Sequence, residues 1–317
     1  MNIELSAEAT EYGRQARRAF EAAGGAALLE SAEREPDRRA ELLAPVFGAL
    51  AAWDLRPRKD PDELEAAAAL CRAAGYWGVP YPVAERLSRP TDSEFDGLVI
   101  VDDTTPSAAV AGLDLRWAAM TLDGRRSSAE RAEPSLAPRL GAFVTPLKLR
   151  PIDAGDVTDI ALALVLPCWT LLGMLDRAIA LATAHVSVRE QFGQPLARLQ
   201  GVQFQLTDAE VERGGVDVLA SYALWSVQTE RAEAIDDALA LRLAAVEAAE
   251  VVFRVAHQLH GALGFCDESP LSWLSRYSLP LRRLPFGISG SRAELTKRVG
   301  RHGLTGLFGP VGESVTP

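Results

Sequence analysis

Cysteine and histidine are scarce in this sequence, and basic residues are fewer than acidic ones; each of these features excludes a class of protein. The three cysteines are odd in number and far apart, which predicts neither a disulfide framework nor a zinc site. No Glu-x-x-His motif occurs in the helical regions, which disfavours a ferritin-like di-iron oxidase. Acidic residues outnumber lysine and arginine by 43 to 33, and the formal net charge of −10 argues against a general nucleic-acid-binding protein.

The sequence also lacks a segment that would direct it to a membrane or hold it there. Its first nine residues contain no charged stretch followed by an apolar core, so we expect no signal peptide. The longest apolar run, Ile160–Met174, is interrupted by Pro167 and is too short to span a bilayer. We therefore expect a cytoplasmic protein that binds neither membranes nor nucleic acid.

The residues that are abundant favour a helical globular protein. At 317 residues the chain can bury a substantial core, and this length suggests about two domains. Its content of 48% hydrophobic and 24% charged residues is ordinary for a globular chain. Alanine and arginine are common, whereas asparagine, lysine and isoleucine are scarce, which favours helices.

The first part of the chain, residues 1–92, is predicted to be a helical domain. Ser6 can cap a helix that runs to Ala22, and Gly24-Gly25 can close it. Further helices are predicted over 35–55 and from Pro61 to Ala74. The segment 75–82 is rich in glycine, proline and aromatic residues and is predicted to be a turn.

Residues 93–154 are predicted to form a small β domain, because the apolar residues there alternate or form short buried runs. Asp123-Gly124 is a hairpin signal that follows one of the predicted strands. Pro146 is expected to push the last predicted strand to an edge of the sheet. The predicted strands are Leu98–Val101, Ala108–Leu113, Leu115–Leu122 and Ala142–Arg150.

Residues 155–317 are predicted to form a bundle of long antiparallel helices. Pro167 is expected to kink the first helix, and Gly214-Gly215 to weaken the second. The predicted helices are 157–190, 202–232 and 236–259, followed by shorter ones at 271–277 and 291–300.

The segment Arg189–Gln200, REQFGQPLARLQ, joins the first two helices of this bundle. Gly193 and Pro195 alone would suffice for such an elbow. From the residues alone, Arg189 is most simply a solvated charge that interacts with the dipole at a helix C-terminus. However, arginine also suits bidentate contact with phosphate, and a neighbouring aromatic such as Phe192 can cover a flat ring.

Two motifs in this bundle resemble those of the acyl-CoA dehydrogenase family. The elbow resembles the family signature R-E-Q-F-G-Q-P-L-x-x-x-Q, and Gln258–Phe265 resembles the family motif Q-x-x-G-G-x-G-[FY]. The resemblance implies a mainly α fold with a helical N-terminal domain, a middle β domain and a C-terminal helical bundle. It also implies FAD as cofactor, with these residues of one subunit reaching the FAD of its neighbour.

The resemblance assigns a role to each residue of the two motifs. Arg189 would bind the FAD pyrophosphate, Gln191 would hydrogen-bond it, and Phe192 would pack near the adenosine. Gln258 and the turn at Gly261 would cradle the adenine end through backbone groups. Gln200 completes the elbow signature, and Ala262 stands where the family has its second glycine, so close backbone approach is less favourable there. His260, between them, is expected to be a core or interface histidine.

The sequence departs from the family at the flavin ring and at the catalytic base. The β region is about half the family's size and lacks the T-E-P and W-I-T-N-like segments that hold the flavin ring and part of the acyl-CoA. One family position for the base falls in the turn 284–290, which contains no acid; the nearest is Glu294. The other falls at Ala163. The sequence therefore predicts no catalytic residue in this chain.

This combination resembles the non-catalytic subunit of heteromeric acyl-CoA dehydrogenases known from actinobacterial steroid catabolism. The resemblance implies an α2β2 complex with a catalytic subunit, FAD shared across the subunit interface, an acyl-CoA substrate and electron-transfer flavoprotein as electron acceptor. Two alternatives remain open at this point: a self-sufficient flavoenzyme with an unrecognised base, and a non-redox scaffold subunit. The basic run 276–301 either is solvated or faces an anionic cofactor or a partner.

Overall fold

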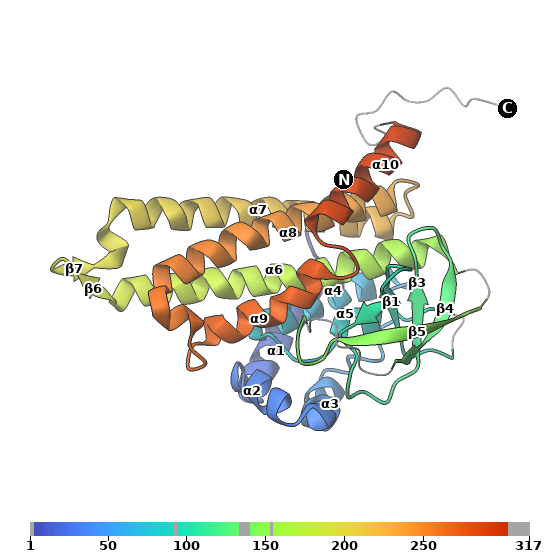
Figure 1. Cartoon of the computed structure of the whole chain (residues 1–317), viewed down its shortest axis with the longest axis horizontal. Helices are drawn as coiled ribbons and strands as arrows, with labels where there is room; N and C mark the ends of the chain where they lie inside the picture. The colour runs from blue at the N-terminus through green and yellow to red at the C-terminus, as the bar shows by residue number, and fades with distance from the viewer. Residues whose placement is uncertain (1–2, 92–93, 133–139, 153–154, 304–317) are drawn as a thin grey trace.

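The computed structural model describes residues 3–91, 94–132, 140–152 and 155–303. The described residues form a helical N-terminal part, a small sheet and a long helical bundle (Figure 1). The mainly α fold with a small sheet is as predicted from the sequence. The predicted domain boundaries fall beside residues 92–93 and 153–154, which lie outside the described residues, so the division into three domains stays a prediction.

In the N-terminal part, the predicted cap of the first helix is present, but the predicted extent of the second helix differs from the structure. The Ser6 side chain accepts a hydrogen bond from the Ala9 amide and starts α1. The helix predicted over 35–55 is present but shorter, as α3, because Pro36 starts a 3₁₀ turn before it. The elements are α1 Ala7–Ala22, α2 Ala27–Arg34, η1 Pro36–Arg38, α3 Arg39–Ala49, α4 Pro61–Trp77 and α5 Val83–Leu87.

The turn predicted at 75–82 begins three residues later than expected, because Gly75 lies inside α4. A Cβ atom on Gly75 would lie 1.9 Å from the carbonyl oxygen of Thr170 in α6 (Val157–Val188). A Cβ atom on Gly173 would likewise lie 2.0 Å from the carbonyl oxygen of Arg72 in α4. These two glycines let α4 and α6 touch backbone to backbone, and the helix ends only at Gly78, which has a φ of 61°.

The small sheet has the strand order β1-β3-β4-β5-β2, in which β1 and β3 are parallel and the other pairs are antiparallel. The strands predicted at 98–101 and 115–122 and the turn at Asp123-Gly124 are present. The strand predicted at 108–113 is wrong, because only Ser107–Ala108 pairs and Gly112, at a φ of 71°, turns the chain away. The strands are β1 Gly97–Ile100, β2 Ser107–Ala108, β3 Trp117–Met120, β4 Arg126–Arg131 and β5 Thr145–Pro151.

Pro146 does not lie at an edge of the sheet, since β5 is placed between β4 and β2. The sheet tolerates this proline because its carbonyl still takes part in the pairing. That carbonyl accepts a hydrogen bond from the Ala132 amide at 2.9 Å. The next amide, that of Leu147, donates to the Pro106 carbonyl at 2.8 Å. The missing N–H of proline therefore costs little at this position.

The C-terminal bundle is built around α6, which packs against α4, α7 and α8. This helix runs unbroken through Pro167, as α7 does through Gly214-Gly215, so neither interrupts its helix. By length and composition α6 could cross a membrane, but 78% of its most apolar window is buried inside the protein, as in a core helix. The elements are α6 Val157–Val188, β6 Glu190–Gln191, β7 Gln194–Pro195, η2 Leu196–Arg198, α7 Gln200–Gln228, α8 Ala234–His260, η3 Gly261–Phe265, α9 Pro270–Arg283 and α10 Ile288–His302.

One apolar core joins the N-terminal helices to the bundle, and a smaller cluster lies on the sheet. The larger core includes side chains of α1, α4, α6, α7 and α8. A charged contact holds the same helices together at their surface. Arg72 of α4 pairs with Asp176 of α6 at 2.7 Å and with Asp217 of α7 at 2.9 Å. The bundle is thereby fixed in position relative to the N-terminal helices.

Candidate functional site

The elbow between α6 and α7 is a two-residue β-hairpin at one end of the bundle, where β6 and β7 project (Figure 1). Its central residues are Phe192, with a φ of 54°, and Gly193, with a φ of 75°. Both values are in the left-handed region, which such a tight hairpin requires and which glycine adopts freely. Phenylalanine does so at a cost of about 1–2 kcal/mol. Its side chain is nevertheless 85% exposed, so no packing within the described chain offsets that cost.

The polar residues of the elbow also face solvent. Arg189 follows the last turn of α6, and its amide donates to the His185 carbonyl at 2.9 Å. Its guanidinium is exposed and has no ion pair in the part of the chain that the structure describes. Gln191 and Gln200, the first residue of α7, are exposed as well.

The second motif lies where α8 ends. Gln258 is exposed in the last turn of α8, and the helix stops at Gly261, which has a φ of 60° and a ψ of −144°. A Cβ atom on Gly261 would meet no atom within 4 Å, so the backbone there is open to approach. Ala262 follows on the exposed side of η3.

Stacked rings bring the two motifs together. The ring of His185, in the last turn of α6, stacks on that of His260, the last residue of α8, with centroids 4.5 Å apart. His257 stacks in turn on Phe265 of η3 at 4.4 Å. His260 therefore lies at the contact between two helix ends, and both motifs share one end of the bundle.

The pKa values of these imidazoles favour the neutral form. Burial lowers the pKa of His185 and of His257 below the ordinary value of 6.5. The neighbouring His260 lowers both pKa values further, and the charge of Arg189 acts in the same direction on His185. Both shifts favour the neutral form of the His185 and His257 rings.

An apolar stripe continues from this end along the outer face of α7. Phe204, Val211 and Val218 are spaced seven residues apart and are 60–66% exposed. Gly201 and Gly215 lie on the same face, with open space where a Cβ atom would be. Apolar and small residues at this spacing are typical of a seam that packs against another helix. We call these five residues the outer stripe.

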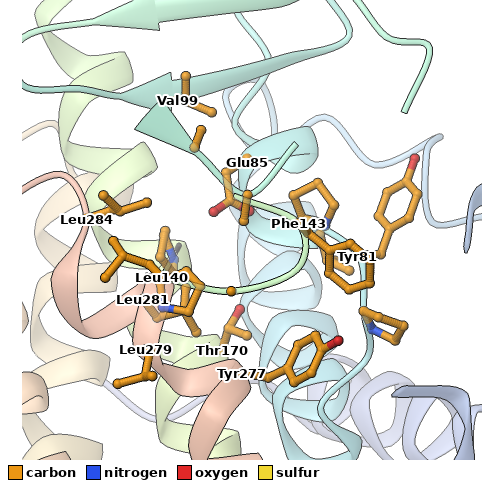
Figure 2. Close-up of a pocket in the computed structure, with 18 of the residues that line it drawn as sticks. Tyr81, Glu85, Val99, Leu140, Phe143, Thr170, Tyr277, Leu279, Leu281 and Leu284 are labelled. Carbon is orange, nitrogen blue, oxygen red and sulfur yellow. The ribbon is translucent and has the colours of Figure 1, made fainter. Parts of the chain in front are cut away.

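A separate cavity of about 310 Å³ lies between the N-terminal helices, the sheet and the bundle. Its walls come from α5, β1, α6 and α9 and from the segments 79–82 and 140–143 (Figure 2). Ala163 of α6 and Leu284, at the end of α9, both border it. Arg242 of α8 holds the adjoining turn, donating to the carbonyls of Leu284 at 2.6 Å and Phe286 at 3.0 Å.

The sequence interpretation missed both acids on this cavity wall: Glu33 of α2, which accepts a hydrogen bond from Tyr277, and Glu85 of α5. Glu85 is half-buried on the cavity wall, and burial raises the pKa of its carboxyl group. No local pattern distinguishes it from a solvent-facing helix glutamate, so only the tertiary fold could have found it. Glu294, by contrast, lies on α10 in an ion pair with Lys297 at 3.5 Å and does not line this cavity.

Comparison with known proteins identifies the bundle. Residues 165–288 match the family model described as Acyl-CoA dehydrogenase, C-terminal domain. This segment of the chain is therefore similar to the C-terminal domain of acyl-CoA dehydrogenases. Acryloyl-CoA reductase (NADH) from Anaerotignum propionicum is 30% identical over 105 residues, which is 33% of this chain and 26% of that protein. Acyl-CoA dehydrogenase FadE28 from Mycobacterium tuberculosis is 29% identical over 130 residues, which is 39% of this chain and 38% of that protein. The matches thus span well under half of these relatives.

The fold of the whole chain is also that of acyl-CoA dehydrogenases. A chain of the ChsE4-ChsE5 complex from Mycobacterium tuberculosis superposes with a TM-score of 0.77 at 16% identity, covering 96% of this chain and 100% of that one. A chain of the Tcur3481-Tcur3483 steroid ACAD gives 0.76 at 20% identity, covering 94% and 99%. Butyryl-CoA dehydrogenase from Megasphaera elsdenii gives 0.68 at 13% identity, covering 95% and 100%. The fold class predicted from the sequence is confirmed.

Similarity to the acyl-CoA dehydrogenase C-terminal domain implies FAD in general, and the elbow end of the bundle has groups that fit part of it. The free guanidinium of Arg189 suits a pyrophosphate, the exposed ring of Phe192 suits a flat base, and the open backbone at Gly261 allows close approach. The individual contacts assigned to Gln191, Gln200, Gln258 and Ala262 stay predictions.

The two positions at which the sequence analysis expects the family's catalytic base lie on the wall of the interior cavity. Ala163 and the start of the turn 284–290 both border it, and neither carries a carboxylate. The acids that do line the cavity are Glu33, which accepts a hydrogen bond from Tyr277, and Glu85.

Proposed function

We propose that this chain is the subunit of a heteromeric FAD-dependent acyl-CoA dehydrogenase that completes the FAD site of a catalytic partner. The complex would introduce a double bond between the α and β carbons of an acyl-CoA thioester. The observation that carries the proposal is the elbow, where Arg189 and a strained Phe192 point into solvent. Strained and exposed groups of this kind are characteristic of binding sites.

The elbow is too far from the chain's own cavity to serve it. Met174 is the last α6 residue on the cavity wall, and Arg189 follows it by 15 residues. At 1.5 Å per residue this is about 22 Å along the helix. The elbow side chains are therefore free to line a site on a neighbouring chain.

The outer stripe supports a partner chain beside the elbow. An exposed apolar surface that continues from a binding site favours a protein interface. A heteromeric partner, rather than a second copy, is favoured by the structural neighbours, since both the ChsE4-ChsE5 complex and Tcur3481-Tcur3483 are named as pairs. The word steroid in the second name favours a steroid-derived acyl group.

In the proposed complex, the partner supplies the catalytic base and this chain supplies contacts to FAD. In acyl-CoA dehydrogenation a carboxylate removes the proton α to the thioester, and the β hydride passes to FAD. Neither Ala163 nor the turn 284–290 of this chain can supply that base, so in the proposed complex the partner supplies it. Arg189 would hold the pyrophosphate and Phe192 would cover the adenosine, and electrons would leave to electron-transfer flavoprotein.

One observation favours the alternative of a self-sufficient enzyme. Glu85 places a carboxyl group in the chain's own cavity, and such a group can act as a base. The test is the flavin content of the full chain purified alone and after co-expression with a catalytic acyl-CoA dehydrogenase subunit. We expect no bound flavin for the chain alone, and one FAD per pair of subunits in the complex. One tightly bound FAD per chain in the isolated protein would favour the alternative, and no flavin in either preparation would favour a non-redox scaffold.

A further inference from the structure

A pocket of about 310 Å³ lies between the N-terminal helices and the sheet, away from both surfaces described so far. Its walls come from the segment 55–59 before α4, from residues 87–91 at the end of α5, and from residues just before β1 and β3. It shares no lining residue with the interior cavity. We call it the basic pocket, because of the side chains on its wall.

Cationic side chains dominate this wall, although the chain as a whole carries a formal net charge of −10. Among the described residues, the charged side chains on the wall are five cations and one acid: Arg56, Arg58, Lys59, Arg89, Arg116 and Asp96. Such a concentration of one sign in a concave site raises the local concentration of anions.

Two of these cations are neutralised by acids. Arg58 pairs with Asp159 of α6 at 2.7 Å, and the Nε atom of Arg116 lies 3.8 Å from the carboxylate of Asp96. The other three cations have no ion pair with any residue that the structure describes. The wall therefore has positive charge that no described acid balances.

Two of the three unpaired cations, Arg56 and Arg89, are anchored on the same backbone oxygens. Nη1 of Arg56 donates to the carbonyls of Trp53 at 2.7 Å and Leu55 at 3.1 Å. Nη2 of Arg89 donates to the same two carbonyls at 2.8 Å and 2.9 Å. Because both groups bind the same two oxygen atoms, they lie close together. Uncharged carbonyl groups thus hold two positive charges side by side without neutralising either.

This anchoring leaves donors of both guanidinium groups free. Nε and Nη2 of Arg56, and Nε and Nη1 of Arg89, have no hydrogen bond to any described residue. Arg56 is exposed, and neither free nitrogen of Arg89 is fully buried. Burial lowers the pKa of Arg89, and the charges of Arg56 and Arg86 lower it further. An anion between these groups would relieve that repulsion.

The basic pocket lies far from the elbow. Arg58 connects it to Asp159 in the first turn of α6, and Arg189 follows Asp159 by 30 residues. At 1.5 Å per residue this is about 45 Å along the helix. Figure 1 likewise shows the sheet and the elbow at opposite ends of α6. A ligand in the basic pocket is therefore distinct from a cofactor at the elbow.

We propose that the basic pocket binds the phosphate group of a small soluble molecule, with Arg56 and Arg89 as direct ligands and Lys59 as a further cation. The free N–H groups of the two arginines donate to the phosphate oxygens. A phosphate is favoured because it offers three acceptor oxygens, enough for two guanidinium groups, and arginine matches their geometry. A small molecule is favoured over an acidic protein segment because the site is a pocket of limited volume.

The test measures the binding of inorganic pyrophosphate to the full chain by isothermal titration calorimetry. Arg56→Gln/Arg89→Gln removes both direct ligands, so the affinity should fall about tenfold to a hundredfold. The matched control, Arg14→Gln/Arg18→Gln, removes the same charge from exposed arginines of α1 and should leave the affinity unchanged.

A third variant keeps the test decisive if the first one fails to fold, since Arg56 and Arg89 also hold the segment 53–55. Lys59→Glu removes no hydrogen bond or ion pair of the described residues and reverses one charge of the pocket. It should weaken pyrophosphate binding several-fold at an unchanged melting temperature.

The proposal is overturned if the wild type shows no saturable pyrophosphate binding, if Lys59→Glu binds as tightly as the wild type, or if the control variant loses as much affinity as Arg56→Gln/Arg89→Gln. A hexaglutamate peptide is titrated in parallel, and tighter binding of the peptide would assign the pocket to an acidic protein segment instead.

The elbow is tested separately, because pyrophosphate is also part of FAD. Arg189→Ala should bind pyrophosphate as the wild type does, and a loss there would place the probe at the elbow and overturn the proposal. Flavin retention by the co-expressed complex should not change in Lys59→Glu. A failure of the basic pocket is thereby distinguishable from a failure of the shared FAD site.

Discussion

Phe192 is held in a backbone conformation that its residue type disfavours. Asparagine adopts positive φ more readily than phenylalanine, so Phe192→Asn should relieve strain in the hairpin. We expect the free energy of unfolding of the isolated chain to rise by roughly 0.5–1 kcal/mol, as measured by urea denaturation. The same variant should retain less FAD in the complex, because it removes the exposed ring. A loss of stability, or unchanged flavin retention, would contradict this account of the elbow.

The histidine stack should make the elbow end sensitive to acid. Because the pKa values of His185 and His257 are lower in the folded chain than in the unfolded chain, the unfolded chain binds protons first as pH falls through about 6.5. Acidification from pH 7.5 to 5.5 should therefore lower the melting temperature. The double variant His185→Gln/His257→Gln should show a smaller decrease over the same window. Equal pH dependence of the two melting temperatures would mean that the imidazoles do not contribute.

The sequence could assign roles to individual residues only where those residues belong to a recognisable motif. Arg189 and Phe192 were found because their spacing to Gly193 and Pro195 matches a family signature, and the structure places both on the surface. Glu85 and Arg242 could not be found, because what matters about them is their surroundings. One faces a cavity built from segments far apart in sequence, and the other bonds to carbonyls about 40 residues away.

At the scale of elements, the crossing of α4 and α6 depends on two glycines. Gly173→Ala would place a Cβ atom 2.0 Å from the backbone oxygen of Arg72, and backbone cannot move aside as a side chain can. We expect it to lower the free energy of unfolding by about 3 kcal/mol, measured by urea denaturation. The control is Gly214→Ala in α7, where a Cβ atom meets nothing within 4 Å. It should raise stability by about 0.5–1 kcal/mol. Equal effects of the two substitutions would show that the close approach is unimportant.

Element prediction succeeded where apolar periodicity was long. The helices expected at 157–190 and 236–259 correspond to α6 and α8 within a few residues. It failed in short segments where a single residue redirects the chain. The 3₁₀ turn that begins at Pro36 delays the helix predicted at 35–55 until Arg39, and Gly112 turns the predicted strand at 108–113 away from the sheet. Gly75 was assigned to a turn because its contact with α6 is not visible in the local sequence.

At the scale of the whole molecule, two surfaces with different chemistry lie on different parts of one fold. The elbow and the outer stripe form an exposed face with a free cation and apolar side chains, which suits a partner chain and a shared anionic cofactor. The interior cavity is largely apolar, and its wall carries Glu85, whose carboxyl group has no side-chain partner in the described residues. The sequence pointed to the first surface through two motifs. It could not point to the second, because the cavity walls come from segments far apart in the sequence, from α2 to α9.

The central claim is that Arg189 binds the FAD of a partner subunit, and it is tested most directly by FAD affinity in the assembled complex. Arg189→Ala removes a charge-assisted contact that contributes about 1.5–3 kcal/mol, so the FAD dissociation constant should rise roughly tenfold to a hundredfold while the subunits stay associated. The matched control is Arg198→Ala, which removes an exposed arginine of the same elbow outside the assigned set and should leave FAD affinity unchanged. Unchanged affinity in Arg189→Ala, or an equal loss in both variants, would contradict the account.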